Sequence, residues 1–431
     1  MVTPLLVPRN GTPEFIENES ALARAITELA KGSGDIAIDA ERASGYRYSQ
    51  RAYLIQIYRK GGGLYLIDPI PLLNSNLWQE FNKNFADSVW VIHASTQDLP
   101  CLIGVGLKPR YLFDTELGAR IAGCERVGLG PLAENLLDIQ LAKEHSAVDW
   151  SVRPLKPEWL TYAALDVDIL LEIKDAVENL LTEQNKLQWA KQDFSAILNS
   201  FDNYQFSDKP KPDRWRRTSG MHRVRDRLTL TIVRDLWLSR DELAAELDIA
   251  PGRVLGDEAI IELALSRPTE LEAVAKAIGW RTKLESPPFG RWLKVLSNAL
   301  LTPIDQQPEY KVPSNTLPPV RVWKEKNPIG YARLTHARSQ LINLAAELKI
   351  PVENLITPEF VRRICWQEPP KSESRYQEFI VGELSKYGAR DWQIEQVLAP
   401  LKNAIGQTEP ILITEAQEDE PAVESAQVSE Q

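Results

Sequence analysis

Residues 35–67 read DIAIDAERASGYRYSQRAYLIQIYRKGGGLYLI. The stretch contains three short apolar runs, at residues 35–39, 54–58 and 64–67, and three consecutive glycines separate the last two runs. Short apolar runs bounded by turn residues are typical of buried strands, and a glycine turn between two of them indicates a hairpin. The stretch therefore predicts the centre of a β-sheet.

Strand and helix patterns alternate on the C-terminal side of this stretch. The run VWVIH at residues 89–93 is typical of another buried strand. Residues 157–183 have the pattern of one long helix that a proline opens. Alternation of this kind favours an α/β domain with a largely mixed sheet, which we expect over residues 1–205.

Four acidic residues and one tyrosine come from elements that a single sheet could bring together. Asp39 and Glu41 are two residues apart on the first strand, so their side chains leave the same face. Asp98 follows the fourth strand at the start of a helix. Tyr162 and Asp166 are four residues apart in the long helix and share a face. Neighbouring carboxylates repel one another unless a cation lies between them, and hard divalent cations prefer oxygen ligands.

Each of these signals is weak when it is taken alone. A pair of acids at a strand end is more often solvated, and an aspartate at a helix start is usually a cap. A tyrosine and an aspartate at helical spacing usually lie on a half-exposed surface. The combination is what indicates a metal site, since two divalent ions can stabilise the attacking and leaving oxygens of a phosphoryl displacement.

Composition excludes several classes of protein. The chain has 431 residues, of which 43% are hydrophobic and 26% are charged, and its formal net charge is -10. These values exclude wholesale disorder and a membrane-dominated architecture, and the length indicates about two or three domains. Three cysteines without disulfide or metal-ligand spacing, and an N-terminus without a signal-peptide pattern, predict a cytoplasmic protein with no membrane partner.

The negative charge is distributed unevenly. Residues 1–200 carry a net charge of -7, residues 201–407 carry +4, and residues 408–431 carry -7. The last part lacks aromatic and basic residues, so we expect a disordered acidic tail over residues 406–431. The total charge therefore does not exclude a nucleic-acid partner, because the central region is net positive.

Basic residues and prolines mark a boundary at residues 206–216, which we interpret as a basic linker. Trp215, Arg216 and Arg217 lie at its end and have two interpretations. They could hold a nucleic acid, with a base stacked on the indole and phosphates against the guanidinium groups. The alternative is an ordinary solvated linker.

An internal repeat follows this linker. The sequence LAAEL at residues 243–247 recurs at residues 344–348, an offset of 101 residues, and matched glutamates and prolines follow both copies. Both copies have the pattern of a helix, a short turn and a second helix. We therefore predict two small all-helical domains, at residues 217–298 and 328–405, with a proline-rich linker at residues 299–327.

Three runs of sequence carry a resemblance to a known family. The run AIDAERASGYRYSQRAYLIQIYRKGGGLYLIDPI, the run VIHASTQDLPCL and the run KEHSAVDWSVRPLKPEWLTYAALDVDILLEI closely resemble bacterial ribonuclease D over residues 20–180. That family belongs to the 3′-5′ exonucleases with four acids and a tyrosine. The resemblance implies a ribonuclease-H-like fold. It also implies that the repeated helical domains are HRDC domains, the helicase-and-ribonuclease-D C-terminal module.

The resemblance implies a role for each of the five residues. Asp39, Glu41, Asp98 and Asp166 would hold two Mg²⁺ or Mn²⁺ ions, and Tyr162 would orient the attacking water. Where the family often has a phenylalanine after the second acid, this chain has an arginine that could contact terminal phosphates. The candidate residues beside the substrate are Arg42, Tyr46, Gln56 and His93, with Trp215, Arg216 and Arg217 as further candidates. Gln56 could instead satisfy backbone groups within its buried strand, and His93 at a strand end favours a structural role.

The function implied by the resemblance is a 3′-5′ exoribonuclease that releases 5′-nucleoside monophosphates. We expect RNA as partner, in particular structured 3′ ends such as tRNA precursors, and a monomeric enzyme. Two alternatives stay open. The same chemistry could act on DNA, because the acids do not read the 2′-hydroxyl group. The site could instead be inactive, in a nucleic-acid-binding scaffold whose helical domains carry the function or bind protein.

Overall fold

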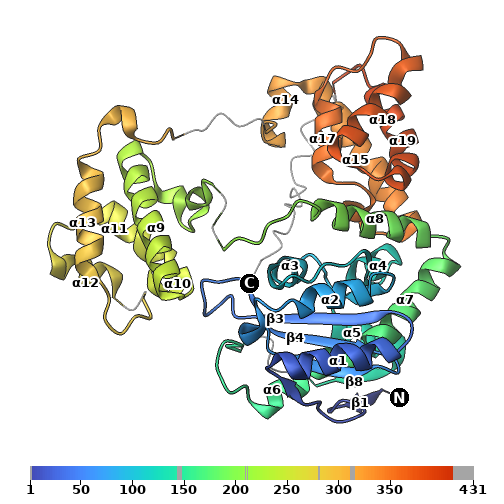
Figure 1. Ribbon diagram of the computed structural model, residues 1–431. Coiled ribbons are helices and arrows are strands. Elements are labelled where there is room, and N and C mark those ends of the chain that lie inside the picture. The colour runs from blue at the N-terminus through green and yellow to red at the C-terminus, as the bar shows by residue number, and fades with distance from the viewer. Residues whose placement is uncertain are drawn as a thin grey trace.

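The computed structural model describes residues 2–142, 148–208, 210, 212–279, 282–310 and 316–410. It consists of an α/β domain and two helical units that stand apart from each other (Figure 1). Residues 411–431 of the predicted acidic tail, and two lysines of the predicted basic linker, Lys209 and Lys211, lie outside the described residues.

The centre of the α/β domain is a six-stranded sheet with strand order β2-β5-β4-β3-β6-β7. Its strands are β2 (Phe15–Ile16), β3 (Ile36–Arg42), β4 (Ala52–Arg59), β5 (Gly63–Ile67), β6 (Val89–Ile92) and β7 (Tyr111–Asp114). The pairs β3-β4 and β4-β5 are antiparallel, and the other pairs are parallel, so the sheet is mixed, as the sequence predicted. Strands β1 (Thr3–Leu5) and β8 (Ile139–Leu141) form a separate parallel pair.

Helices cover both faces of the sheet. On one face, Ile36 and Ile38 are completely buried in a core that includes Leu22 and Ile26 of α1. On the other face, Leu54 of β4 packs with Ala163 of α6. The helices of this domain are α1 (Glu19–Lys31), α2 (Leu77–Asn84), α3 (Leu99–Val105), α4 (Thr115–Ile121), α5 (Leu129–Leu137), α6 (Pro157–Asp168), α7 (Leu170–Glu183) and α8 (Leu187–Ser200).

The long helix expected over residues 157–183 is divided in two. Ile169 separates α6 from α7, with a backbone φ of -104° that lies outside the helical range. The division lets each helix bury a different face. Helix α6 packs against β3, β4 and β5, whereas α7 packs mainly against α4 and α5. The apolar pattern runs through both helices, so periodicity did not reveal the break.

The five described helices of the first unit have counterparts in the same order in the second unit, which begins with one additional short helix, α14 (Trp323–Lys326). The first unit contains α9 (Arg227–Leu247), α10 (Pro251–Val254), α11 (Asp257–Ser266), α12 (Leu271–Ile278) and α13 (Phe289–Leu300). The second contains α14 (Trp323–Lys326), α15 (Pro328–Leu348), α16 (Val352–Leu355), α17 (Pro358–Trp366), α18 (Tyr376–Tyr387) and α19 (Asp391–Ile405). The long helices α9 and α15 both have 21 residues, and they begin 101 residues apart.

The repeat extends to the ends of the long helices. Asp226 caps α9 by accepting a hydrogen bond from Thr229 N at 2.8 Å, and Asn327 caps α15 in the same way from Gly330 N at 2.8 Å. Both helices end in a residue with positive φ, Asp248 at 48° and Lys349 at 51°. This agreement in local geometry supports a duplicated unit more strongly than the shared LAAEL sequence alone.

Each helical unit begins before its first long helix. Trp215 belongs to the buried core of the first unit, and Trp323 to that of the second. The second unit docks on the α/β domain through α19 and α8, where Trp392 stacks on Trp189 with ring centroids 4.9 Å apart. In the described part of the chain, no helix combines the length and apolar character needed to cross a membrane.

Candidate active site

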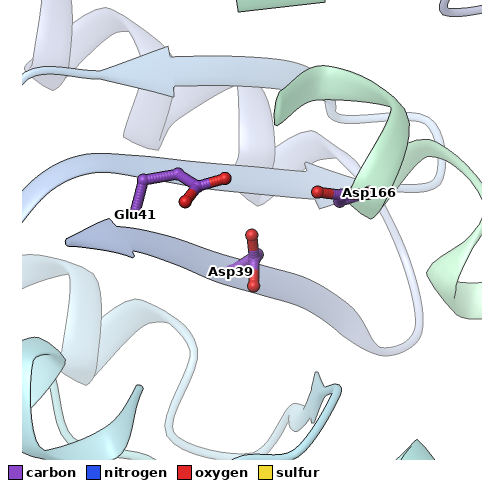
Figure 2. Close-up of side chains that lie close together, drawn as sticks. All are labelled: Asp39, Glu41 and Asp166. Atoms are coloured by element: carbon purple, nitrogen blue, oxygen red, sulfur yellow. The ribbon is translucent and has the colours of Figure 1, made fainter. Parts of the chain in front are cut away.

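Three carboxylates converge at the end of β3. Asp39 and Glu41 leave the strand on one face, and Asp166 comes from α6, which packs against β3. One oxygen atom from each of the three lies within 4.8 Å of the other two. Figure 2 shows the three side chains turned toward one another from the strand and the helix. The i, i+2 spacing on a strand and the helix packing therefore produce the cluster that the sequence predicted.

Asp98 joins this cluster through Asp39. It occupies the N-cap position of α3, but its side chain makes no capping hydrogen bond. The Asp98 side chain is buried and forms a hydrogen bond with Asp39 instead. A hydrogen bond between two carboxyl groups requires a proton on one of them. Asp39 and Asp98 therefore share a proton when no cation is bound between them.

Burial controls the charge of the site. It raises the pKa of Asp39, and it raises the pKa of Glu41, Asp98 and Asp166 well above the ordinary values. Repulsion from the Asp39 charge is the second cause of the raised pKa in Glu41, Asp98 and Asp166. For Asp166, burial and this repulsion are the two causes of the raised pKa. The guanidinium group of Arg42 acts in the opposite direction and lowers the pKa of its acidic neighbours.

The donor set fits hard divalent cations. All the donors are carboxylate oxygens, which are the ligands that Mg²⁺ and Mn²⁺ prefer. The same carboxylates are half-buried or buried and repel one another, so a bound cation would relieve an unfavourable charge distribution. Asp39, Glu41 and Asp166 are close enough to share one ion. Asp98 lies next to Asp39 and extends the site on the other side.

Tyr162 lies one helical turn before Asp166. Its side chain is half-buried and packs against the cluster of apolar residues between α6 and the sheet. Burial is the main cause that raises the pKa of Tyr162, and the charges of Asp166, Glu41 and Asp39 add to it. The phenol therefore keeps its proton at neutral pH, and it lies within the electrostatic field of the acidic cluster.

Arg42 is the last residue of β3, and Tyr46 lies in the loop that follows it. Arg42 Nε lies 3.9 Å from Asp98 Oδ1, so this arginine is part of the site. Tyr46 is half-buried, and the guanidinium group of Arg253 from the first helical unit covers its ring at 4.2 Å from the centroid. Its carbonyl oxygen accepts a hydrogen bond from Ala250 N at 2.9 Å. Tyr46 is thus a contact between domains, and its place beside the substrate stays a prediction.

For Gln56 and His93 the structure favours the structural alternative over a place beside the substrate. Gln56 lies opposite Asp39 in the β3-β4 register, but it is completely buried, so it has no surface for a substrate. Neither atom of its amide has a hydrogen-bond partner within the described chain. His93 Nδ1 lies 2.9 Å from Thr115 Oγ1 at the start of α4, and burial lowers its pKa. This histidine is therefore a neutral structural group.

Trp215, Arg216 and Arg217 lie in the first helical unit. Trp215 is only 5% exposed and packs in the core of that unit, so its ring cannot stack on a base. The Arg216 guanidinium group lies 4.3 Å from the centroid of the same ring, and Arg217 is exposed. The prediction that Trp215 is a stacking platform was wrong. A tryptophan between basic residues gives the same sequence pattern whether its ring is exposed or buried in a core.

Sequence patterns missed a set of residues that hold the loop after β3. Asp241, Asp248 and Arg253 of the first helical unit contact this loop, although they are about 200 residues away in sequence. Each belongs to an ordinary helical or turn pattern. The repeat could have revealed these residues. At an offset of 101 residues the second unit has Ile342, Lys349 and Asn354 at the equivalent positions, so the three polar residues are specific to the first unit.

Three regions of the chain match known protein families. Residues 13–182 match the family described as 3′-5′ exonuclease. Residues 229–284 match the HRDC domain, and residues 316–405 match the family described as 3′ to 5′ exonuclease C-terminal domain. The two helical units thus match different families, although their helices repeat in the same order.

Individual proteins match over larger parts of the chain. The ribonuclease D of Xanthomonas oryzae pv. oryzae is 30% identical over 270 residues, which cover 61% of this chain and 70% of that protein. Other curated ribonuclease D relatives are matched over 58%, 47% and 48% of their own length. The crystal structure of a protein from Bifidobacterium adolescentis is 37% identical, with a TM-score of 0.82, and covers 94% of this chain and 100% of its own.

A more distant structure shares the fold. Escherichia coli RNase D, described as an exoribonuclease involved in structured RNA processing, is 21% identical with a TM-score of 0.61. The match covers 87% of this chain and 99% of the E. coli chain. At this identity the likeness establishes the arrangement of the α/β domain and helical units, and nothing about the substrate.

Proposed function

Because this chain belongs to the ribonuclease D family, we propose that it is a metal-dependent 3′-5′ exoribonuclease. The observation that carries the proposal is the group of acids at the end of β3, in which three half-buried carboxylates lie together and Asp98 beside them is buried. A group of carboxylates that raise one another's pKa values is unfavourable in a protein unless cations bind there. The match of residues 13–182 to a 3′-5′ exonuclease family supports the removal of nucleotides from a 3′ end as the reaction of this site.

Each acid has a role in this proposal. Asp39, Glu41 and Asp166 would hold one divalent ion, and Asp39 with Asp98 would hold a second, Mg²⁺ or Mn²⁺ in both cases. When bound, such ions supply an activated water at neutral pH and stabilise charge on the attacking and leaving oxygens. The Tyr162 hydroxyl group would orient the attacking water by hydrogen bonding, since it keeps its own proton.

The reaction is a hydrolysis of the last phosphodiester bond. The water oxygen bonds to phosphorus, the bond from phosphorus to the 3′-oxygen breaks, and a proton passes to that oxygen. The shortened strand keeps a 3′-hydroxyl group, and the terminal nucleotide leaves as a 5′-monophosphate. Arg42, 3.9 Å from Asp98, is suitably placed to contact the negative charge of the terminal phosphates.

We propose structured RNA 3′ ends, in particular those of tRNA precursors, as the substrate. The name of the curated relatives supports RNA, and the E. coli protein of the same fold is described as acting in structured RNA processing. All three cysteines are free, which fits a reducing compartment such as the cytoplasm.

The first experiment identifies both polymer and polarity. RNA and DNA oligonucleotides of equal length and sequence are labelled at either end and incubated with the full chain in Mg²⁺, in Mn²⁺, or in EDTA. We expect stepwise shortening of RNA with early release of the 3′ label as a mononucleotide, and no reaction in EDTA. Early release of the 5′ label, a preference for DNA, or hydrolysis in EDTA would each contradict the proposal.

Tyr162→Phe separates the role of the hydroxyl group from that of the metal ligands. We expect kcat to fall by about a hundredfold, the order of magnitude for a positioned proton-transfer or orienting group. The affinity for Mn²⁺, measured by titration calorimetry, should stay unchanged because no carboxylate is altered. The matched control is Tyr111→Phe at an exposed tyrosine on β7. Equal losses of kcat in both variants would exclude a specific role for Tyr162.

A further inference from the structure

Both helical units contact the α/β domain through an equivalent corner of their own, and the second unit also docks through α19. In each unit this corner is the end of the long helix and the turn after it, residues 241–253 in the first unit and 342–354 in the second. In the second corner, the carbonyl oxygen of Leu348 accepts a hydrogen bond from Lys186 at 2.6 Å. A Cβ atom added at Gly123 would lie 2.3 Å from the carbonyl oxygen of Lys349, so the backbones are closely packed.

The two corners meet very different parts of the α/β domain. The second corner lies against the C-terminal end of α4 and the start of α8, since Lys186 also donates to Ile121 O at 3.0 Å. The first corner meets residues 43–51, the loop that directly continues β3 after Glu41 and Arg42. Duplicated units thus use equivalent corners, and within the described residues only the first touches a segment of the active site.

Polar contacts fix this loop on the first corner. Asp241 accepts a hydrogen bond from the Tyr48 hydroxyl group at 2.9 Å, and Asp248 accepts one from Ser49 N at 3.1 Å. Arg253 Nε donates to Gly45 O at 2.6 Å. The acids match donors in the loop, whereas Ile342 and Lys349 hold the equivalent positions in the second corner and cannot accept these bonds. The contact is therefore specific to the first unit.

Tyr46 connects the loop to the reacting groups. The Arg253 guanidinium group lies over its ring, and the ring also packs against the buried cluster that includes Trp150 and Trp159. Tyr162 packs against the same cluster. A shift of the loop therefore changes the packing that supports Tyr162, and the loop begins directly after Arg42, two residues after the proposed metal ligand Glu41.

We propose that Asp241, Asp248 and Arg253 are positioning residues for the exonuclease reaction. They hold the 43–51 loop in one arrangement, and through Tyr46 they keep Tyr162 aligned with the acidic cluster. The inference rests on the proposed exonuclease function and deepens it, because it assigns the first helical unit a part in the chemical step. A catalytic group displaced by about 1 Å can lower the rate by roughly a hundredfold, so modest loosening of the loop is sufficient.

The test compares variants of the full chain. In Asp241→Ala with Asp248→Ala we expect kcat to fall about tenfold to a hundredfold, while KM for RNA changes less than about twofold. Asp241→Asn with Asp248→Asn should restore most of kcat, because the amide oxygen can still accept both hydrogen bonds. Tyr48→Phe should have little further effect once Asp241 is alanine. An unchanged kcat, or a loss confined to KM, overturns the proposal, since the unit would then contribute only RNA binding.

Two control variants separate positioning from general damage. Glu242→Gln removes an exposed charge from the same helix without touching the loop, and should leave kcat unchanged. Lys186→Met loosens the second corner and should affect stability but not kcat.

Hydrogen exchange tests the coupling without any activity measurement. In the alanine double variant we expect faster exchange in residues 43–51 and in the turn of α6 around Tyr162. Faster exchange confined to α9 and α10 would refute the coupling even if the wild-type chain hydrolysed RNA normally. If the wild-type chain hydrolysed no RNA, the proposed function would fail, and the exchange result would still decide whether the first unit orders the loop.

Discussion

Asp39→Asn and Asp166→Asn are each expected to lower RNA hydrolysis by at least about a thousandfold. Each substitution removes one charged oxygen ligand from the three that lie within 4.8 Å of one another. Bound metal ions contribute several kcal/mol of transition-state stabilisation, and about 1.4 kcal/mol corresponds to a factor of ten in rate. The amide that replaces the carboxylate has nearly the same shape, so the fold should be retained.

The matched control for these variants is Asp168→Asn. Asp168 is in the same helix as Asp166 and is buried, but its carboxylate accepts a hydrogen bond from Arg9 N at 3.1 Å and faces away from the acidic cluster. We expect nearly full activity for this variant. Calorimetry should show weaker Mn²⁺ binding in Asp39→Asn and Asp166→Asn than in the control. Activity retained in either ligand variant would refute the assigned metal site.

In EDTA, Asp39→Asn is expected to be more stable than the wild-type chain at pH 8, by about 1 to 3 kcal/mol, the usual cost of a charged group that its surroundings do not fully compensate. Asp39 repels Glu41, Asp98 and Asp166, and all four pKa values are raised in the folded state. Removing one charge relieves three repulsions at once. The stabilised variant would also be the inactive one, which is a frequent relation in active sites.

The pH dependence follows from the direction of these shifts. A carboxyl group whose pKa is raised by folding stabilises the fold fully below the unfolded value of about 4, and this stability is lost as pH rises through the folded value. The difference in melting temperature between Asp39→Asn and the wild type in EDTA should therefore grow from pH 5 to pH 8. At roughly 2 to 4 °C per kcal/mol, thermal unfolding can measure it.

Divalent ions should reverse the difference in melting temperature between Asp39→Asn and the wild type. Because bound cations compensate the carboxylates, Mg²⁺ or Mn²⁺ should raise the melting temperature of the wild type more at pH 8 than at pH 5. Asp39→Asn should respond less, since it has lost a ligand. A melting temperature of the wild type that is independent of both pH and metal would contradict the raised pKa values.

The strands and the acidic cluster could be predicted because their signals are local. Asp39 and Glu41 share a face by the period of a strand, and Tyr162 and Asp166 share one by the period of a helix. The order of the strands then brings β3 and α6 together. What the sequence could not reveal is which chain segment covers a given side chain.

Tyr46 and Trp215 are examples of this limit. Tyr46 is an aromatic residue in a loop beside an active site, a pattern that favours a substrate contact, yet Arg253 covers it from another domain. Trp215 lies among basic residues, a pattern typical of nucleic-acid binding, yet it is buried in the core of the first unit. Both outcomes depend on packing between distant segments, which composition and periodicity do not encode.

The first helical unit meets the 43–51 loop through a few hydrogen bonds and one stacked guanidinium group. Between separate proteins, such a small polar contact would dissociate readily. Here α8 ends at Ser200 and α9 begins at Arg227, so the chain itself keeps the partners near each other. A short tether gives an effective concentration of the order of millimolar. The unit can therefore release the loop and recapture it without diffusing away.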